Sequence, residues 1–258
     1  MKTVKADLSN ELKSVEIHTF SDWHIGDKYC KKETIKKQID EVKQKENAFA
    51  ILNGDLINNA TKTSVSDCYA EEMPPMEAIE YIIDLISPIK EKVLMINQGN
   101  HEARTYRTEG IDISSLVASQ LGISDRYCRE GGLLFIRFGK NTAESKNRKQ
   151  WYSIYCTHGN GDGRKEGAKA IRLADMASIV DADIYIHSHT HLPMVMKQSF
   201  YRVSGSNSSV ALCEKLFVNT DAKLDYGGYG QSLEFKPSSN SSPVIYLSGT
   251  RKEFTARL

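Results

Sequence analysis

The sequence predicts an α/β layered fold in one domain. Through most of the chain, short apolar runs rich in β-branched residues end in polar turns marked by Gly or Asn, and longer helical patterns follow them. This alternation is typical of sheets covered by helices. A length of 258 residues suits one large sheet-based domain. We therefore expect a single domain over residues 1–258, with a carboxyl-terminal third made mainly of strands.

The amino-terminal half supplies three strands, each followed by a helix. Apolar residues at positions 79, 82, 83 and 86, after Pro74 and Pro75, have the spacing of an amphipathic helix. Gly122 marks the end of the last of these helices. The predicted strands cover residues 15–20, 49–52 and 93–96, and the predicted helices cover residues 32–45, 77–89 and 114–120.

The pattern changes after residue 132. Residues 133–138 and 151–156 flank the polar stretch 139–150 and predict a hairpin. A helix over residues 168–180 and a strand over residues 184–186 follow. The remaining strand-like runs are residues 194–202, 213–219, 231–235 and 244–248, and the Ser/Asn-rich residues 204–209 and 237–243 are expected to be surface loops.

Composition excludes several classes of protein. Lys and Arg number 34 against 33 Asp and Glu, so the chain is not a basic protein that coats nucleic acid by counterion release alone. The five cysteines are scattered without a Cys-x-x-Cys pair, which argues against a disulfide framework and a zinc knuckle and favours a reducing, cytoplasmic setting. No apolar run approaches about 18 residues, and no apolar core follows the first lysines. We expect a soluble protein that is neither exported nor bound to a membrane.

Five short segments carry the chemistry of the chain. They are Asp22-Trp23-His24, Gly54-Asp55, Gly99-Asn100-His101-Glu102, Thr157-His158-Gly159 and His189-Thr190-His191. Each follows a predicted strand, which places them along one edge of the sheet structure, where ligands of open α/β sheets collect. Ions such as Mn, Fe and Zn prefer imidazole nitrogens mixed with carboxylate and amide oxygens, and these segments supply both. The ordered set therefore predicts a two-metal phosphoesterase site.

Taken singly, these segments are weak signals. Asp-x-His and Gly-Asp occur by chance in many chains. His189 and His191 could end a strand with one buried and one exposed ring, and His158 could decorate the glycine-rich turn that follows it. The order and combination of the segments carry the inference.

With these motifs the chain resembles the calcineurin-like metallophosphoesterases over residues 15–191. The signature of that family runs Asp-x-His, Gly-Asp, Gly-Asn-His-Asp/Glu, a lone His and Gly-His-x-His. The resemblance implies a four-layer β-sandwich flanked by helices, with two divalent metals at the strand ends. The implied ligands are Asp22, His24 and His191 for one metal, Asn100, His158 and His189 for the other, and Asp55 as the bridge.

The resemblance also implies a reaction. Two ions lower the pKa of a shared water and clamp the phosphate oxygens, so that the activated water attacks phosphorus. His101 is implied to lie beside the metals, where it can protonate the departing alkoxide or stabilise charge on the phosphate. Glu102 has two open interpretations, orientation of a histidine or a plain salt bridge. Mn is the expected metal, and Fe, Zn, Ni and Mg suit the same ligands.

Two departures from the family signature matter. Ser188 replaces the Gly before His-x-His, and His187 is expected to end its strand. Residues 56–59 lack the Asp-Arg-Gly of the protein Ser/Thr phosphatases, which favours the phosphodiesterase and nuclease branches. We expect hydrolysis of phosphodiester bonds in DNA, RNA or a nucleotide. The alternatives are a phosphomonoesterase or protein phosphatase, and a non-catalytic metal-stabilised binding module, against which the intact His101 argues.

Further residues are weaker candidates, each with a plain structural alternative. An amide after Asp55 could contact water or the phosphate, or cap a turn. The basic loop 159–165 could reach the phosphate through Arg164 or Lys165, or be solvated. The Gly/Tyr-rich segment 224–230 could form a lid that stacks a base, or a β-turn. His18 is expected to pack within its strand, not to bind metal. The substrate-binding candidates are Asn58, Asn59, Arg164 and Tyr226.

Oligomeric state stays open at this level. The carboxyl-terminal β segment could supply an edge strand that pairs with a second copy, and a monomer is equally compatible with the sequence.

Overall fold

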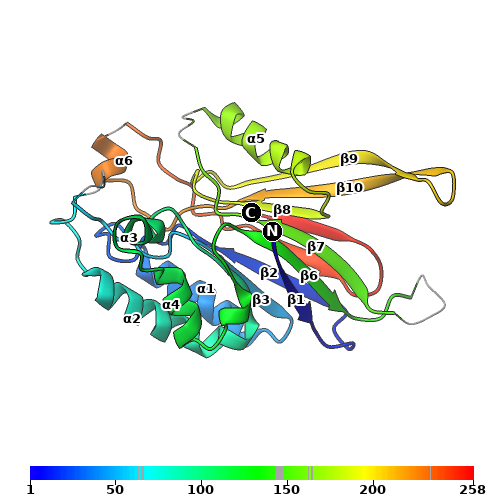
Figure 1. The fold of residues 1–258 in the computed structure, drawn as a ribbon, viewed down its shortest axis with the longest axis horizontal. Coiled ribbons are helices and arrows are strands. Elements are labelled where there is room, and N and C mark those ends of the chain that lie inside the picture. The colour runs from blue at the N-terminus through cyan, green and yellow to red at the C-terminus, as the bar shows by residue number, and fades with distance from the viewer. Residues whose placement is uncertain (63, 65–66, 143–147, 162, 164, 233) are drawn as a thin grey trace.

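Two sheets packed face to face form the centre of the molecule (Figure 1). The computed structural model describes residues 1–258 except 63, 65–66, 143–147, 162, 164 and 233. In spatial order, the first sheet contains β1 (Lys2–Asp7), β6 (Gly132–Phe138), β7 (Gln150–Cys156), β8 (Ile184–His187), β10 (Ser209–Asn219) and β9 (Met194–Ser204). The second contains β12 (Phe254–Arg257), β11 (Val244–Ser248), β2 (Ser14–Phe20), β3 (Ala48–Asn53), β4 (Val93–Asn97) and β5 (Tyr127–Cys128).

Helices cover the outer faces of both sheets. The α-helices are α1 (Lys32–Gln44), α2 (Pro75–Ile86), α3 (Glu102–Glu109), α4 (Ile113–Gln120), α5 (Glu166–Asp175) and α6 (Gly228–Ser232). Short 3-10 helices are η1 (Ser87–Lys92), η2 (Ser124–Arg126) and η3 (Met176–Ser178). None of the helices among the described residues is long and apolar enough to cross a membrane.

Three apolar clusters define four layers. One cluster joins α1, α2 and α4 to the outer face of the second sheet, through residues such as Ile35, Ile82 and Leu52. The second lies between the sheets, and the third joins α5 to the outer face of the first sheet. Because β3 is buried on both faces, its sequence is a continuous apolar run instead of an alternating one. The predicted α/β fold, its two flanked sheets and its strand-rich carboxyl-terminal third are confirmed.

Parallel pairing brings the strand ends of interest to one edge. In the second sheet β2, β3 and β4 run parallel, with Phe20 opposite Leu52 and Leu52 opposite Ile96. In the first sheet β7, β8 and β10 also run parallel, with Cys156 opposite Ile186. The carboxyl ends of both parallel sets therefore present their loops side by side.

The structure corrects some of the predicted elements. The strand predicted over residues 231–235 is not found among the described residues of that range: the short helix α6 occupies Gly228–Ser232, where the Gln231 amide donates to the Gly227 carbonyl. The helix predicted over residues 77–89 ends at Ile86 and continues as η1, because Pro88 lacks an amide donor. Strands β1 and β12 and helix α3 were absent from the sequence prediction. Part of the predicted loop 139–150 lies outside the described residues.

Asp112 joins the start of α4 to the end of the second sheet. Its carboxylate accepts a hydrogen bond from the Ser115 amide at 3.0 Å, which caps α4. It also accepts bonds from the Tyr127 hydroxyl at 2.7 Å and from Arg129 Nε at 2.9 Å.

Replacing Asp112 with Ala should lower the free energy of unfolding by about 1–2 kcal/mol, because the helix cap and the tether to β5 are lost together. Urea denaturation measures this loss. The control Asp84→Ala changes an exposed carboxylate on α2 and should stay within about 0.5 kcal/mol of the unsubstituted chain. Equal effects of the two substitutions would contradict the assigned role of Asp112.

Candidate metal centre

The seven predicted metal ligands converge at the shared edge of the two sheets. Together with His101, six of them form three groups, and within each group the ligand atoms lie within 4.8 Å of one another. Asn100 belongs to the same constellation, because its Oδ1 lies 3.0 Å from His158 Nε2 and 2.7 Å from His189 Nδ1. The three groups are Asp22, His24 and His191; His24, Asp55 and His101; and Asp55, His158 and His189.

The first group leaves a carboxylate oxygen free to bind a cation. Asp22 is fully buried, and its Oδ2 accepts hydrogen bonds from Ser21 Oγ at 2.6 Å and from the His189 amide at 3.3 Å. Its Oδ1 lies 3.1 Å from His191 Nε2 and has no hydrogen-bond partner among the described residues. His24 Nε2 lies 3.3 Å from His191 Nε2. Buried polar atoms are rarely left in this state, so this donor set fits a metal ion.

In the third group, Asp55, His158 and His189, the backbone orients the imidazole of His158. His158 Nδ1 lies 2.7 Å from the carbonyl oxygen of Asn53, which can only accept, so Nδ1 carries the proton of the neutral ring. Nε2, the atom that binds metal in this tautomer, lies 3.2 Å from Asp55 Oδ2. Asp55 Oδ1 accepts a bond from the His101 amide at 2.8 Å. A cation placed by His158 and Asp55 would therefore meet two prepared donors.

Most of these ligands have a left-handed backbone conformation. The φ angles are 49° at Asp22, 49° at His24, 51° at Asp55, 67° at His189 and 53° at His191. Residues with a Cβ adopt this region rarely, and each costs on the order of 1–2 kcal/mol. Their concentration at one edge shows that the surrounding fold holds the ligand turns in place.

Glu102 fastens two of the ligand turns together. Its buried carboxylate accepts hydrogen bonds from the amides of Asp55 at 3.0 Å, Leu56 at 2.7 Å, Ile57 at 3.2 Å and Gly99 at 3.0 Å. Among the described residues Glu102 binds backbone amides and neither a histidine nor a cation, so both interpretations offered by the sequence are wrong. Burial, followed by the charge of Asp55, raises the pKa of Glu102 to about 7.

Charge compensation at the site comes from imidazoles. Burial by itself raises the pKa of Asp55, but the neighbouring His101 and His158 outweigh it and hold that pKa well below its usual range. Burial lowers the pKa of His158, yet the charge of Asp55 outweighs this effect and raises the pKa to about 10. Burial, followed by His101, lowers the pKa of His24. A divalent cation would supply the same compensation to the buried carboxylates.

His101 lies at the mouth of this constellation. Its Nδ1 donates to the Asn58 carbonyl oxygen at 2.6 Å, and its Nε2 lies 3.7 Å from Asp55 Oδ2. Arg104 Nη2 approaches the same Nε2 at 3.0 Å, and Arg104 Nη1 donates to the Asn58 carbonyl at 3.0 Å. Burial is the main cause of the lowered pKa of His101. The ring is thus held by both nitrogens beside the ligand groups.

The amides predicted to meet substrate have partners inside the protein. Asn58 Nδ2 donates to Glu71 Oε1 at 2.9 Å. Asn59 Nδ2 donates to the His101 carbonyl at 2.7 Å and to Thr105 Oγ1 at 3.0 Å. These contacts favour the turn-capping interpretation of both residues.

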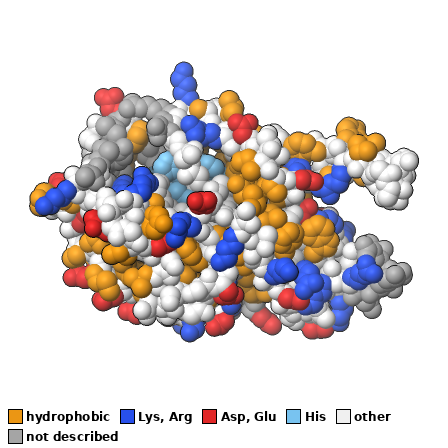
Figure 2. Space-filling view, viewed as in Figure 1, with side chains coloured by type: hydrophobic (Ala, Val, Ile, Leu, Met, Phe, Trp, Pro, Cys, Tyr) orange, Lys and Arg blue, Asp and Glu red, His pale blue; other side chains and the backbone are white. Residues whose placement is uncertain are grey.

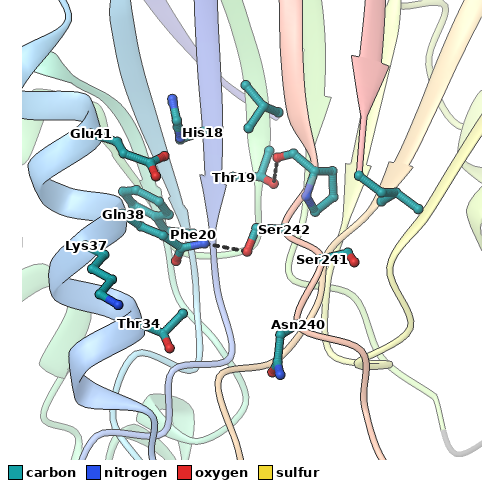
Figure 3. Close-up of a pocket in the computed structure, with 13 residues that line it drawn as sticks. His18, Thr19, Phe20, Thr34, Lys37, Gln38, Glu41, Asn240, Ser241 and Ser242 are labelled. Atoms are coloured by element: carbon teal, nitrogen blue, oxygen red, sulfur yellow. Dashed lines mark hydrogen bonds between the residues drawn. The ribbon is translucent and has the colours of Figure 1, made fainter.

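The other weak candidates separate from the site in different ways. Arg164 lies outside the described residues, and Lys165 is exposed just before α5. Tyr226 is 48% exposed and has no contact with a ligand residue among the described interactions. His18 is buried in β2 and lines a separate cavity of about 350 Å³ between α1 and residues 240–244 (Figure 3). His187 ends β8 and faces Asn219, as expected.

Two basic residues at the site were missed by the sequence analysis. Arg104 depends on α3, whose mean hydropathy is low and which has no apolar stripe to predict it. Lys169 on α5 donates to the Thr190 carbonyl at 2.7 Å, between His189 and His191. No motif in the sequence marks Lys169, because its contact depends on where α5 packs in the folded chain.

Comparison with solved structures finds similar chains at low identity. A single mutant of Vps29 from Entamoeba histolytica is 13% identical, with 94% of this chain and 90% of that chain covered and a TM-score of 0.45. A predicted phosphoesterase from Streptococcus pneumoniae is 15% identical, with coverage of 95% and 99% and a TM-score of 0.34. Nuclease MPE from Pseudomonas putida is 12% identical, with coverage of 93% and 87% and a TM-score of 0.36. None of the curated proteins compared with the chain matches it.

Comparison with protein families is decisive. The model described as calcineurin-like phosphoesterase matches residues 16–193, which is more than half of the chain. The matched residues include all seven predicted metal ligands and His101. The expected resemblance is thereby confirmed, and this chain belongs to the calcineurin-like phosphoesterase family.

Proposed function

We propose that this chain is a dinuclear metal-dependent phosphodiesterase that hydrolyses phosphodiester bonds of nucleic acids or nucleotides. The observation that carries the proposal is the position of Asp55. Its carboxylate belongs to two of the three donor groups, one with His24 and His101 and one with His158 and His189. A carboxylate shared in this way can bridge two cations, which is the arrangement that two-metal hydrolysis requires.

The donor groups suggest how two ions would be held. Asp22, His24 and His191 would bind one ion, and Asn100, His158 and His189 the other, with Asp55 between them. Bound divalent ions of this kind neutralise phosphate oxygens and lower the pKa of an attacking water. Mn is the ion we favour, and Fe, Zn, Ni and Mg also suit this mixture of imidazole, carboxylate and amide donors.

His101 is the residue proposed to act on the leaving group. Its side chain is 13% exposed, whereas that of Asp55 is 1% exposed, and its Nε2 lies 3.7 Å from Asp55 Oδ2. The Asn58 carbonyl holds the opposite nitrogen, so the ring is oriented before substrate arrives. Because Nδ1 holds the hydrogen of the neutral ring, Nε2 can deliver a proton to the departing oxygen or donate to the phosphate only in the charged ring. Asp55 favours that charged form, and this contribution is worth about 10²–10⁴-fold in rate.

Positive charge beside the site supports an anionic, extended substrate. Figure 2 shows histidine side chains at the surface of this face with Lys and Arg side chains close by. Arg104 contacts His101, and Lys169 contacts the backbone between His189 and His191. Since the chain as a whole carries a net charge of only +1, this positive charge is local to the site. Phosphates on both sides of a scissile bond would find cations there.

The expected cytoplasmic location is part of the same proposal. The five cysteines are all free in the structure, which suits a reducing compartment.

Hydrolysis of bis-p-nitrophenyl phosphate and p-nitrophenyl phosphate by chelator-stripped protein with added Mn tests the function. We expect metal-dependent turnover that favours the diester, and a loss of about 10²–10⁴-fold in kcat for His101→Ala at unchanged metal content. Preference for the monoester would contradict the diester assignment. Absence of turnover of both esters by fully metal-loaded protein would favour the non-catalytic binding module.

Metal stoichiometry tests the dinuclear site separately. We expect two Mn ions per chain and fewer in Asp55→Asn, because the bridging carboxylate is lost. Each ion present at about 100 times its dissociation constant should stabilise the fold by about 2.7 kcal/mol, or about 5.4 kcal/mol for two ions, so chelation should lower Tm. Equilibrium dialysis with metal analysis and thermal unfolding measure both effects. One ion per wild-type chain at saturation would contradict the proposal.

Arg104 should contribute to substrate binding through its charge. Arg104→Ala removes a guanidinium whose bond to a phosphate is worth about 1.5–3 kcal/mol, so kcat/KM for the diester should fall about tenfold to a hundredfold. The control Arg107→Ala changes an exposed Arg on the same helix and should have little effect. Steady-state kinetics measures kcat/KM for both variants. Equal losses would mean that disturbance of α3, not loss of the Arg104 charge, lowers the activity.

A further inference from the structure

The hairpin of β9 and β10 extends beyond the sandwich. The two strands pair antiparallel from Met194 opposite Asn219 to Ser204 opposite Ser209. Only the inner end of β10, Leu216–Asn219, also pairs with β8. The outer halves, residues 198–204 and 209–215, therefore form a two-stranded ribbon among the described residues, and Figure 1 shows it projecting from the molecule.

One face of this ribbon carries an exposed apolar cluster. Tyr201 lies opposite Leu212 and Val203 lies opposite Val210, and residues directly opposite each other share a face. Their side chains are 78%, 63%, 74% and 61% exposed, respectively. We call these four residues the ribbon patch.

The ribbon patch continues the face that forms the core. Because residues alternate along a strand, the patch shares its face with Val195 and Val218. These two valines pack between the sheets, at the inner end of the same strands. Between the core and the patch this face carries Leu216 and the ion pair of Lys197 with Glu214, so the exposed patch is separated from the buried core by one neutralised pair of charges.

The opposite face of the ribbon has partners in the same chain. Phe200 and Met196 pack against the cluster beneath α5, and Lys215 is buried against Tyr185. Isolated two-stranded ribbons are only marginally stable in water, and contiguous exposed apolar patches mark interaction sites. The patch therefore needs a covering surface that this chain does not supply among its described residues.

We infer that the ribbon patch binds the ribbon patch of a second copy of the chain, across a two-fold axis. An isologous interface requires a surface that complements itself, and four uncharged apolar side chains in two cross-strand pairs meet this requirement. Two charged residues lie nearest the patch on its face, Lys197 and Glu214. They form a salt bridge at 3.0 Å, so their charges cancel. The patch thus offers no charge complementarity to an acidic or a basic partner, and two copies of a chain with net charge +1 repel only weakly.

The size of the patch sets the expected affinity. Stable interfaces bury about 800 Å² per partner, and an apolar patch of this kind supplies a few hundred Å². Strand β9 adds an edge that, among the described residues, pairs with β10 alone, so backbone groups lie next to the apolar side chains. We expect a reversible dimer whose population depends on protein concentration in the micromolar range.

Two substitutions on neighbouring residues of β10 test the inference. Leu212→Glu places a charge in the ribbon patch, whereas Ala211→Glu places the same charge on the opposite face, beside Arg202. Sedimentation velocity from low to high micromolar concentration should show a monomer–dimer equilibrium for the unsubstituted chain and for Ala211→Glu. Leu212→Glu should be monomeric throughout, with an unchanged Tm. Tyr201→Lys repeats the test on β9.

Three results would overturn the inference. They are a wild-type chain that is monomeric at every concentration, a Leu212→Glu chain that still dimerises, and equal loss of the dimer in Leu212→Glu and Ala211→Glu. Turnover of the diester is not part of this readout, because none of the substituted residues belongs to the candidate metal centre. Failure of the proposed hydrolysis and failure of the dimer are therefore separately visible.

Discussion

The buried carboxylate of Glu102 is the contact on which the candidate site depends. Four amides converge on it, three from the turn after β3 and one from the turn after β4. In its charged form, present above its pKa of about 7, Glu102 gains about 1.5–3 kcal/mol from each of these hydrogen bonds, and amides left unpaired at this depth would each cost about 1–3 kcal/mol. Glu102 therefore fixes the separation of the two turns that present Asp55 and Asn100. Gly99 is required at the junction, because a Cβ there would lie 2.1 Å from the Asp55 amide.

The same constraint explains how strained ligand turns persist. The left-handed residues Asp22 and Asp55 follow strands that are fully buried at their ends, and Asp22 donates its amide to the Gly54 carbonyl at 3.0 Å. The His24 amide donates to the Asp55 carbonyl at 3.1 Å, so neighbouring turns satisfy each other's backbone groups. Each turn is thereby held by the next one, and the sandwich below supplies the stability that offsets the strain.

What could be predicted from the sequence follows from periodicity. The strand ends Phe20, Leu52 and Ile96 are each followed by a small polar residue, Ser or Asn, so the convergence of the ligand segments could be foreseen. Residues whose role depends on tertiary contacts could not. Arg104 reaches His101 only because α3 forms, and that helix has no apolar stripe. Glu102 was identified as part of a motif, but the geometry of two turns decides its four amide partners, and residue spacing in the sequence does not predict that geometry.

The first sheet connects the metal centre to the ribbon. Strand β9 begins three residues after His191, and β10 ends at Asn219, whose Nδ2 donates to Thr190 Oγ1 at 2.8 Å and to the Leu192 carbonyl at 2.6 Å. The two strands that carry the ribbon patch at one end thus hold the His189-Thr190-His191 turn at the other. At about 3.3 Å per residue, the outer end of an eleven-residue strand lies about 30 Å from this turn. A second copy bound at the patch would consequently leave the metal ligands of each chain accessible to a long substrate. The dimer contact and the metal ligands lie at opposite ends of the same pair of strands.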